Sequence, residues 1–265
     1  TGIIAKVENK SAIKNIKDII QTSDAIMVAR GDLAVEIGAN EVPHVQLDIV
    51  KKCSELGKPV IIATQMLESM IESNKPTRAE INDVGTAVFQ GADIVMLSAE
   101  TAVGKHPVNA VKTMNDVCLE AEKSPTAKVS HHRLHENFEG IDETIALSSM
   151  YAANHLGARV VATLTQTGKT ALWMSRISSN IAIFAMSDNY KTLKKVTIYR
   201  GVYPCYIDKT SADDWNDVNS HVIENLEDRA EVTNGDIVIV TKGMHKDKSG
   251  GTNLMKILRV GDGNY

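Results

Sequence analysis

The sequence predicts an α/β fold in two parts: half of a TIM (β/α)8 barrel, followed by a separate α/β domain. From residue 3 onward, short apolar β-like runs alternate with segments of helical spacing, and four such units fall within about 120 residues. A polar stretch then breaks the alternation before it resumes. We therefore place a partial barrel domain at 1–122, a linker at 123–140 and an α/β domain at 141–265.

The first part contains four predicted strands with helices between them. We expect the strands at 3–8, 25–29, 60–65 and 94–98. A helix over 11–20 follows the first strand, with Ser11 as its N-cap. The helix around 45–56 should end at Gly57-Lys58-Pro59, a typical stop signal. A further helix begins after Pro76, where Thr77-Arg78-Ala79-Glu80 has the pattern of a capping box.

The second part continues the alternation with a different ending. We expect its strands at 160–165, 181–187, 203–207, 236–241 and 254–260. Helices are expected at 142–157, 169–178, near 189–199 and near 212–231. The last two strands follow one another without a helix between them, which favours an antiparallel strand at the edge of the sheet.

Composition narrows the classes of function. With 265 residues and 43% hydrophobic content, the chain can bury a sizeable core. A net charge of -4 argues against nucleic acid and acidic membranes as partners. The cysteines are three in number and far apart, which disfavours a disulfide framework. No apolar run approaches the ~20 residues that span a bilayer. We expect a cytoplasmic protein that binds small molecules or other proteins.

Polar side chains stand at the end of each of the first four predicted strands. They are Lys6 and Glu8, Arg30 and Asp32, Thr64 and Gln65, and Ser98 and Glu100. A single lysine or glutamate at a strand end is usually a solvated tip or part of a salt bridge. Active sites of β/α barrels are built from strand ends, so four successive polar ends favour a functional site.

The residue types at these ends indicate the chemistry. Glu8 and Asp32, on neighbouring strands, suit Mg²⁺ or Mn²⁺, which prefer oxygen ligands. Zinc is disfavoured because no cysteine or histidine stands at a strand end. A lysine beside such a metal would stabilise charge on an enolate or on a phosphoryl group in transfer. The residues alone indicate a metal-dependent barrel acting on a small anionic substrate.

Long motifs then add a resemblance to a known family. The segments "KVEN", "IMVARGDLAVEI", "GKPVIIATQMLESMI", "PTRAEINDV" and "GADIVMLSAETAVGKHPVNAV" resemble pyruvate kinase, in order and spacing. "GKTALWMSRISSNIAIFAMS" and "IYRGV" are similar to the bacterial branch that AMP or sugar monophosphates activate. The resemblance implies the C-terminal half of the barrel plus the regulatory α/β domain. It also implies transfer of a phosphoryl group from phosphoenolpyruvate to ADP, giving pyruvate and ATP in the last step of glycolysis.

The resemblance assigns substrate and metal roles to the first strand ends. Lys6 would stabilise the phosphoryl group in flight and the enolate oxygen. Glu8 and Asp32 would hold the divalent metal, Mg²⁺ or Mn²⁺. Backbone N–H groups would bind the substrate carboxylate, and these belong to Ala29, Gly31 and Asp32. Glycine has no Cβ, which would let the chain approach a ligand closely.

Four further residues receive roles from the same resemblance. Thr64 would lie beside the methylene carbon, on the route by which the enolate is protonated. Ser98 and Glu100 look like members of the same proton network. Arg30 counts among the substrate-binding residues, although its side chain is better suited to bracing the loop through salt bridges.

The second domain has a candidate phosphate cradle in "TLTQTGKTAL", which reads as a strand, a hydroxyl-rich turn and a helix start. Its residues are Thr165, Thr167, Gly168, Lys169 and Thr170. It is not a Walker A loop, because Thr163 occupies the position of the first glycine. A simple capped helix explains the motif equally well. The resemblance makes it the allosteric pocket, with the segment 242–251 closing on it.

The resemblance covers only the C-terminal half of the family's chain. The first barrel strands, which supply the K⁺ ligands and the arginines for phosphate and nucleotide, are not expected here. The lid domain inserted in the barrel is not expected here either, so we expect the 265 residues alone to be inactive. Half a barrel also leaves two open strand edges, so either the N-terminal half exists elsewhere or the fragment associates. Family members are typically homotetramers.

Three alternatives remain open from the sequence. The first is a non-catalytic, truncated module that binds a phosphorylated effector. The second is a metal-dependent barrel lyase acting on enolpyruvate-like substrates. The third is a cell-adhesion role for the tripeptide Arg30-Gly31-Asp32, which would require a secreted protein with an exposed loop.

Overall fold

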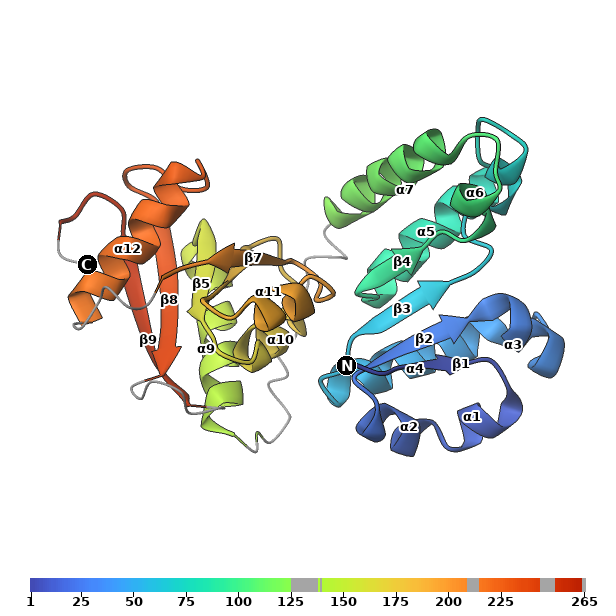
Figure 1. Cartoon of the computed structure of the whole chain (residues 1–265), viewed down its shortest axis with the longest axis horizontal. Coiled ribbons are helices and arrows are strands. Elements are labelled where there is room, and N and C mark those ends of the chain that lie inside the picture. Colours follow the sequence, from blue (N-terminus) through green and yellow to red (C-terminus); the bar gives the residue numbers. More distant parts are fainter. Residues whose placement is uncertain (125–137, 139, 209–214, 244–250, 264–265) are drawn as a thin grey trace. The chain divides into compact units, whose positions relative to one another are not determined.

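The computed structural model describes residues 1–124, 138, 140–208, 215–243 and 251–263 (Figure 1). The chain divides into two compact units, Thr1–Val129 and Ser130–Tyr265, and each is described by itself. Most of the predicted linker lies outside the described residues, so its boundaries at 122 and 141 stay a prediction. No helix in the described parts of the chain is both long and apolar enough to cross a membrane.

The first unit is built on a sheet of four parallel strands. These are β1 (Ile4–Val7), β2 (Ala25–Ala29), β3 (Val60–Ala63) and β4 (Ile94–Met96). The helices are α1 (Lys10–Lys14), α2 (Ile16–Thr22), α3 (Arg30–Ile37), α4 (Val42–Glu55), the 3-10 helix η1 (Glu68–Ile71), α5 (Arg78–Gln90), α6 (Ala99–Ala102) and α7 (Pro107–Glu122). The strands pair in chain order, β1-β2-β3-β4, so their carboxyl ends meet at one edge of the sheet. The predicted β/α alternation is confirmed.

Several local predictions for this unit were wrong. Asn9, not Ser11, caps α1, since the Asn9 side chain accepts a hydrogen bond from the Ala12 N–H. The expected helix over 11–20 is two helices, α1 and α2, which meet at Asn15. The third predicted strand ends at Ala63 and not at 65, because the next two residues have positive φ angles.

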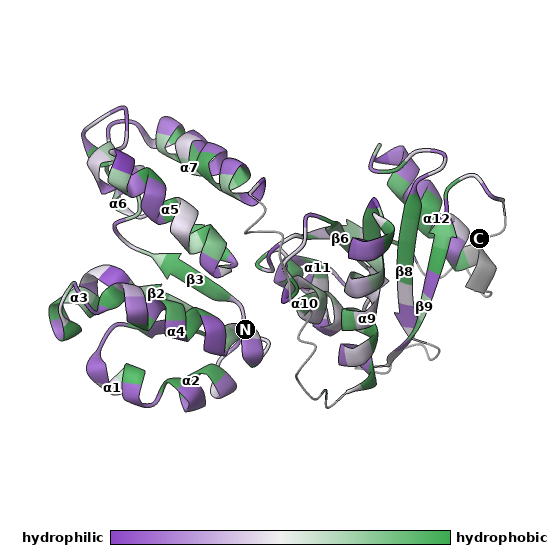
Figure 2. Ribbon diagram, turned by 180° about the vertical axis from the view of Figure 1, so that it is seen from behind, coloured by the Kyte–Doolittle hydropathy of each residue, from purple (hydrophilic) through white to green (hydrophobic). Residues whose placement is uncertain are grey.

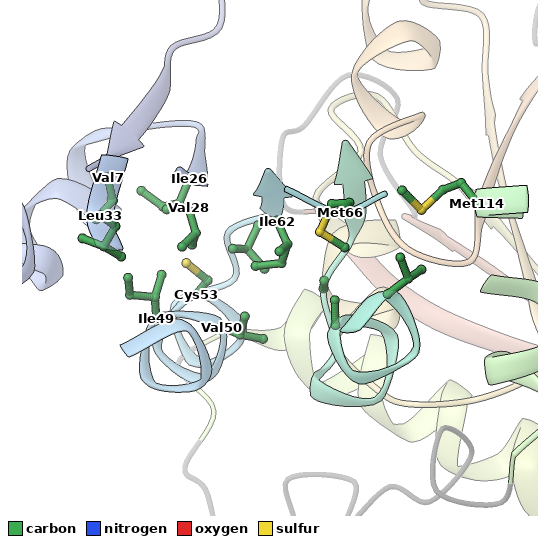
Figure 3. Close-up of a cluster of buried hydrophobic side chains, with 14 of the residues drawn as sticks. Val7, Ile26, Val28, Leu33, Ile49, Val50, Cys53, Ile62, Met66 and Met114 are labelled. Carbon is green, nitrogen blue, oxygen red and sulfur yellow. The ribbon is translucent and has the colours of Figure 1, made fainter. Parts of the chain in front are cut away.

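The core of the first unit lies between the strands and the helices that cover them. In Figure 3, Cys53 of α4 points toward Val28 of β2, and the surrounding buried side chains are almost all aliphatic. All four residues of β3 are buried, and β3 is coloured as hydrophobic in Figure 2. A strand with apolar side chains on both faces is typical of a parallel sheet covered by helices.

The second unit contains a sheet of five strands in the order β7-β6-β5-β8-β9. Its strands are β5 (Val160–Leu164), β6 (Ala182–Ser187), β7 (Val202–Tyr206), β8 (Ile237–Gly243) and β9 (Thr252–Arg259). Its helices are α9 (Ile141–Leu156), α10 (Lys169–Ser175), α11 (Tyr190–Val196) and α12 (Trp215–Asp228). Strand β9 lies at the edge and pairs antiparallel with β8, so the predicted antiparallel edge strand is confirmed.

Alternate residues of β5 serve two different cores. Val160, Ala162 and Leu164 pack with side chains of α12, whereas Val161 packs with side chains of α9 and α10. The period of two in a strand separates these faces, so each needs its own helical cover. The continuous burial of the five residues "VVATL" follows from this arrangement.

The start of α5 has the capping box that the sequence predicted. Thr77 accepts from the Glu80 N–H, and the Glu80 carboxylate accepts from the Thr77 N–H. The same carboxylate accepts from the backbone and hydroxyl of Ser69, at 2.7 and 2.6 Å. Burial acts to raise the pKa of Glu80, but these hydrogen bonds outweigh it, and the pKa lies below its ordinary value.

We predict that Glu80→Gln lowers the free energy of unfolding at neutral pH by about 1 kcal/mol, because a neutral amide with a single acceptor oxygen replaces the charged carboxylate that accepts from Ser69 and Thr77. A lowered folded pKa stabilises the fold above the ordinary pKa of 4.5 and loses that effect as pH falls through the folded pKa. Urea unfolding of both proteins should therefore converge in acid. The exposed Glu55 at the end of α4 provides the control Glu55→Gln, and an equal loss in both variants would contradict the prediction.

Candidate functional site

The ammonium of Lys6 joins two carboxylates at the carboxyl edge of the first sheet. Lys6 Nζ donates to Asp32 Oδ2 at 2.8 Å and also pairs with Glu8. Lys6 lies on β1, Glu8 follows it, and Asp32 lies in the first turn of α3, directly after β2. Parallel pairing aligns Val7 with Val28, which brings these strand ends together. The sequence predicted this grouping of Lys6, Glu8 and Asp32.

Each charge in this cluster stabilises its neighbours. Hydrogen bonds to Asp32, and then to Glu8, raise the pKa of Lys6. The hydrogen bond from Lys6 lowers the pKa of Asp32, so that carboxyl stays ionised in mild acid. The side chains of Lys6, Glu8 and Asp32 are 50%, 39% and 59% exposed, respectively, so water and ligands can reach them. The pairs therefore contribute little to folding stability.

The donor set fits a hard divalent cation in part. Glu8 and Asp32 already direct oxygen atoms at one shared cation, the Lys6 ammonium. Within the described residues, no group of three or more histidine, cysteine, aspartate or glutamate side chains could hold a metal. Mg²⁺ is commonly bound by one or two carboxylates, with water and substrate oxygens completing the octahedron. Glu8 and Asp32 thus fit the carboxylate share of such a site, whose remaining ligands would be water and substrate oxygens.

Gly31 and Thr64 meet beside this cluster. The Gly31 N–H donates to Thr64 Oγ1 at 2.9 Å, which joins the start of α3 to the end of β3. A Cβ added to Gly31 would meet Thr64 Oγ1 at 3.6 Å, an ordinary contact, and its φ is not in the left-handed region. Neither backbone conformation nor packing therefore requires glycine at 31. The substrate-binding role expected of the Gly31 backbone N–H stays a prediction.

Thr64 and Gln65 have left-handed backbone conformations, with φ of 67° and 55°. This region is disfavoured for residues with a Cβ, and a β-branched threonine is an outlier there. Each such residue costs on the order of 1–3 kcal/mol. Strain of this kind persists only where surrounding contacts hold it, and it is common at functional sites.

Arg30 is buried, at 8% exposure, although it belongs to the same tripeptide as Asp32. Its guanidinium donates to the carbonyl oxygens of Thr64 and Gln65, each at 2.9 Å through Nη2. Nη1 pairs with Asp83 of α5 at 2.6 Å. The side chain thus braces the segment after β3. A bracing role through salt bridges was expected from the sequence, but no partner was named, and the substrate-binding role of Arg30 stays a prediction. Sequence reasoning did not identify Asp83, which lies in the "PTRAEINDV" motif but carries no local signal of this pairing.

Ser98 and Glu100 follow β4 and contact the backbone. Glu100 is 2% exposed, and its carboxylate accepts from the N–H groups of Leu67 and Ser98, at 3.1 and 2.7 Å. These bonds fix the segments after β3 and β4 relative to each other. The proton-network role of Ser98 and Glu100, like the binding role of the Ala29 N–H at the end of β2, stays a prediction.

The second unit forms the predicted turn between β5 and α10. Thr165 Oγ1 accepts from the Gly168 N–H at 2.9 Å, and Thr167 Oγ1 accepts from the Lys169 N–H at 3.4 Å. Gly168 has φ of 77°, and an added Cβ would lie 2.7 Å from Val196 Cγ1. Here the fold itself requires glycine.

Two partners of this turn were not identified from sequence. Lys169 Nζ lies 2.9 Å from Oδ2 of Asp142, which is buried in the first turn of α9. The hydroxyl of Thr170 bonds that of Thr252 at 2.8 Å. Both partners are distant in sequence, so no local pattern indicates them. Of the segment expected to close on the turn, residues 244–250 lie outside the described residues.

The fold and the first site define a class: α/β proteins with a β/α-barrel unit, a strand-end carboxylate pair and a second α/β domain. Residues 1–111 match the family model described as pyruvate kinase, barrel domain. Residues 143–258 match the one described as pyruvate kinase, alpha/beta domain. The chain belongs to the pyruvate kinase family.

Individual relatives agree with this membership. The chain is 48% identical over 262 residues to a pyruvate kinase of Buchnera aphidicola (subsp. Baizongia pistaciae), covering 97% of this chain and 54% of the relative. Identity and coverage are the same for pyruvate kinase II of Salmonella typhimurium. The crystal structure of a pyruvate kinase from Cryptosporidium parvum matches with a TM-score of 0.89 and 38% identity, over 97% of this chain and 51% of that one. The chain thus spans about half the length of these relatives.

We predict that Lys6→Met raises the pKa of Asp32 toward its ordinary value of 3.8, because the hydrogen bond from Lys6 is the main cause of the lowered value. A carbon-13 NMR titration of the carboxyl groups would measure this change. Lys52→Met removes a lysine of α4 that pairs with Asp48 and should leave Asp32 unchanged. An Asp32 titration that is the same in both variants would show that the Lys6 contact is absent in solution.

Proposed function

We propose that this chain contributes the metal-binding and substrate-binding part of a pyruvate kinase active site. The reaction is transfer of a phosphoryl group from phosphoenolpyruvate to ADP, giving pyruvate and ATP. One observation carries the proposal: Lys6 joins Glu8 and Asp32 at the strand ends, beside the contact between Gly31 and Thr64. A cation, a carboxylate pair and a glycine that a ligand could approach closely therefore lie at one edge of one sheet.

In this mechanism Glu8 and Asp32 would hold Mg²⁺ or Mn²⁺ together with substrate oxygens. When bound, the cation would neutralise negative charge on the substrate oxygens. With Glu8 and Asp32 engaged in this way, the Lys6 ammonium would be released from its carboxylate partners. Lys6 would then donate to the phosphoryl oxygens and to the enolate oxygen, where negative charge develops.

Gly31 and Thr64 would act on the organic part of the substrate. The N–H groups of Ala29, Gly31 and Asp32 would donate to the substrate carboxylate. The Gly31 N–H now donates to Thr64 Oγ1, so a substrate carboxylate oxygen would replace the hydroxyl as the acceptor of this N–H. Thr64 would thus stand beside the methylene carbon and help deliver its proton. Ser98 and Glu100 would support that proton route.

The remaining parts of the reaction would need more than this sheet. The described barrel unit has four strands, whereas a closed β/α barrel has eight. We propose that ligands for K⁺ and for the nucleotide come from elsewhere in the assembled enzyme, a homotetramer. Accordingly, the 265 residues alone are expected to bind substrate and metal without turnover.

We further propose that the turn from Thr165 to Thr170 binds a phosphorylated effector, AMP or a sugar phosphate. The Thr167 hydroxyl supports this proposal. The hydrogen bond that it accepts from the Lys169 N–H is long, at 3.4 Å, so a phosphate oxygen would readily replace the hydroxyl as the acceptor of that N–H. The non-catalytic alternative, a module that only senses such an effector, rests on the same turn.

Binding of Mn²⁺ with phosphoenolpyruvate tests the first site on the chain itself. We predict that Mn²⁺ broadens the Gly31 amide signal of glycine-labelled protein in NMR spectra. Asp32→Asn should raise the Mn²⁺ concentration needed for this broadening by about tenfold or more, because the metal site loses one of its two carboxylates. Asp48→Asn, at a surface acid on α4, is the matched control. Equal broadening in the two variants would refute the metal role of Asp32.

Gly31→Ala separates ligand binding from folding, with binding of Mn²⁺ and phosphoenolpyruvate followed by calorimetry because this variant lacks the Gly31 amide reporter. Gly31 lies in α3, where alanine is the better helix former, and the added Cβ meets no atom closer than 3.6 Å. Thermal stability should therefore be unchanged or higher, while phosphoenolpyruvate binds more weakly. A variant that binds as well as the original chain would remove the reason given for this glycine.

Calorimetry with AMP, ribose 5-phosphate and fructose 1,6-bisphosphate tests the second site. We predict that one of them binds, and that Thr167→Ala weakens its binding by about tenfold through loss of a hydrogen bond to charged phosphate. Thr197→Ala, at the exposed end of α11, should bind normally. The effector proposal fails if no compound gives heat, or if the two variants bind alike.

A further inference from the structure

We propose that Arg30 and Asp83 are positioning residues that aim the Thr64 hydroxyl by holding Thr64 and Gln65 in left-handed conformation. The contacts form one connected path. Asp83 pairs with the Arg30 guanidinium, the guanidinium holds the carbonyl oxygens of residues 64 and 65, and Thr64 Oγ1 meets the Gly31 N–H. Use of that hydroxyl in catalysis rests on the proposed function; the path itself does not.

Two successive non-glycine residues with positive φ need an external constraint. Nothing in the residue types of Thr64 and Gln65 favours φ of 67° and 55°, and threonine disfavours it strongly. Arg30 supplies the constraint at the backbone itself. Nε and Nη2 both donate to the Thr64 carbonyl oxygen, at 3.2 and 2.9 Å, and Nη2 also donates to that of Gln65 at 2.9 Å.

Only a guanidinium has the donors for this geometry. Its N–H groups lie in one plane and point in fixed directions, so it can hold two carbonyl oxygens and a carboxylate at once. A lysine ammonium carries the same charge without that fork. Arg30 is nearly buried, so its charge requires a partner, and Asp83 on α5 supplies it at 2.6 Å. Asp83 thereby orients the guanidinium toward the carbonyl groups.

The readout is hydrogen exchange of the Gly31 amide, whose acceptor is the hydroxyl being positioned. In glycine-labelled full chain, Arg30→Lys should raise the Gly31 exchange rate by about tenfold, the effect of losing one hydrogen bond. Gly85, inside α5 of the same unit, is the internal reference, because general loosening would accelerate both amides. The exposed Arg78 provides the matched control Arg78→Lys, which should change neither rate.

Rescue by glycine distinguishes positioning from simple loss of packing. Glycine adopts positive φ without a clamp, so Gln65→Gly added to Arg30→Lys should restore at least half of the lost protection at Gly31. Asp83→Asn tests the path independently if Arg30→Lys does not fold, and should raise the Gly31 rate relative to Gly85 severalfold. The proposal is overturned if either single variant leaves that ratio unchanged, or if glycine at 65 gives no rescue. Failure of Mn²⁺ and phosphoenolpyruvate to bind the original chain would instead count against the proposed function alone.

Discussion

Parallel pairing of β1, β2 and β3 is the constraint on which the candidate site depends. It brings Lys6, Asp32 and Thr64 to one edge although they lie far apart in the sequence. The buried apolar strands provide the folding free energy, whereas the exposed ion pairs of Lys6 provide little. Because the fold does not depend on these charges, they can change partners when a ligand binds. A stable sheet and a rearrangeable charge cluster are thus compatible in one unit.

The tripeptide Arg30-Gly31-Asp32 shows how helical geometry divides neighbouring residues among different tasks. Residues two apart on a helix lie on nearly opposite faces, so Arg30 is buried while Asp32 reaches the solvent-exposed cluster. Gly31, between them, presents its N–H to Thr64. A cell-adhesion role would need Arg30 exposed, and its burial against Asp83 argues against that alternative.

Features set by local pattern could be predicted from the sequence, and features set by tertiary contact could not. Apolar runs located the strands, and Thr77 with Glu80 located the start of α5. The end of β3 was missed because the left-handed conformation of Thr64 depends on Arg30, which lies in a different β/α unit. Asp142 was missed for the same reason: its pairing with Lys169 exists only once α9 packs beside α10.

The two glycines at the candidate sites support ligand binding to different degrees. Gly168 is required by its φ of 77° and by the closeness of Val196, so a capped helix is a sufficient explanation for it. Gly31 has neither requirement, and a helix would be more stable with alanine there. A residue that the fold does not need is better explained by what binds beside it. The fold thus leaves Gly31 free for the substrate-binding role proposed for it, whereas the proposed effector site depends on the Thr167 hydroxyl and not on Gly168.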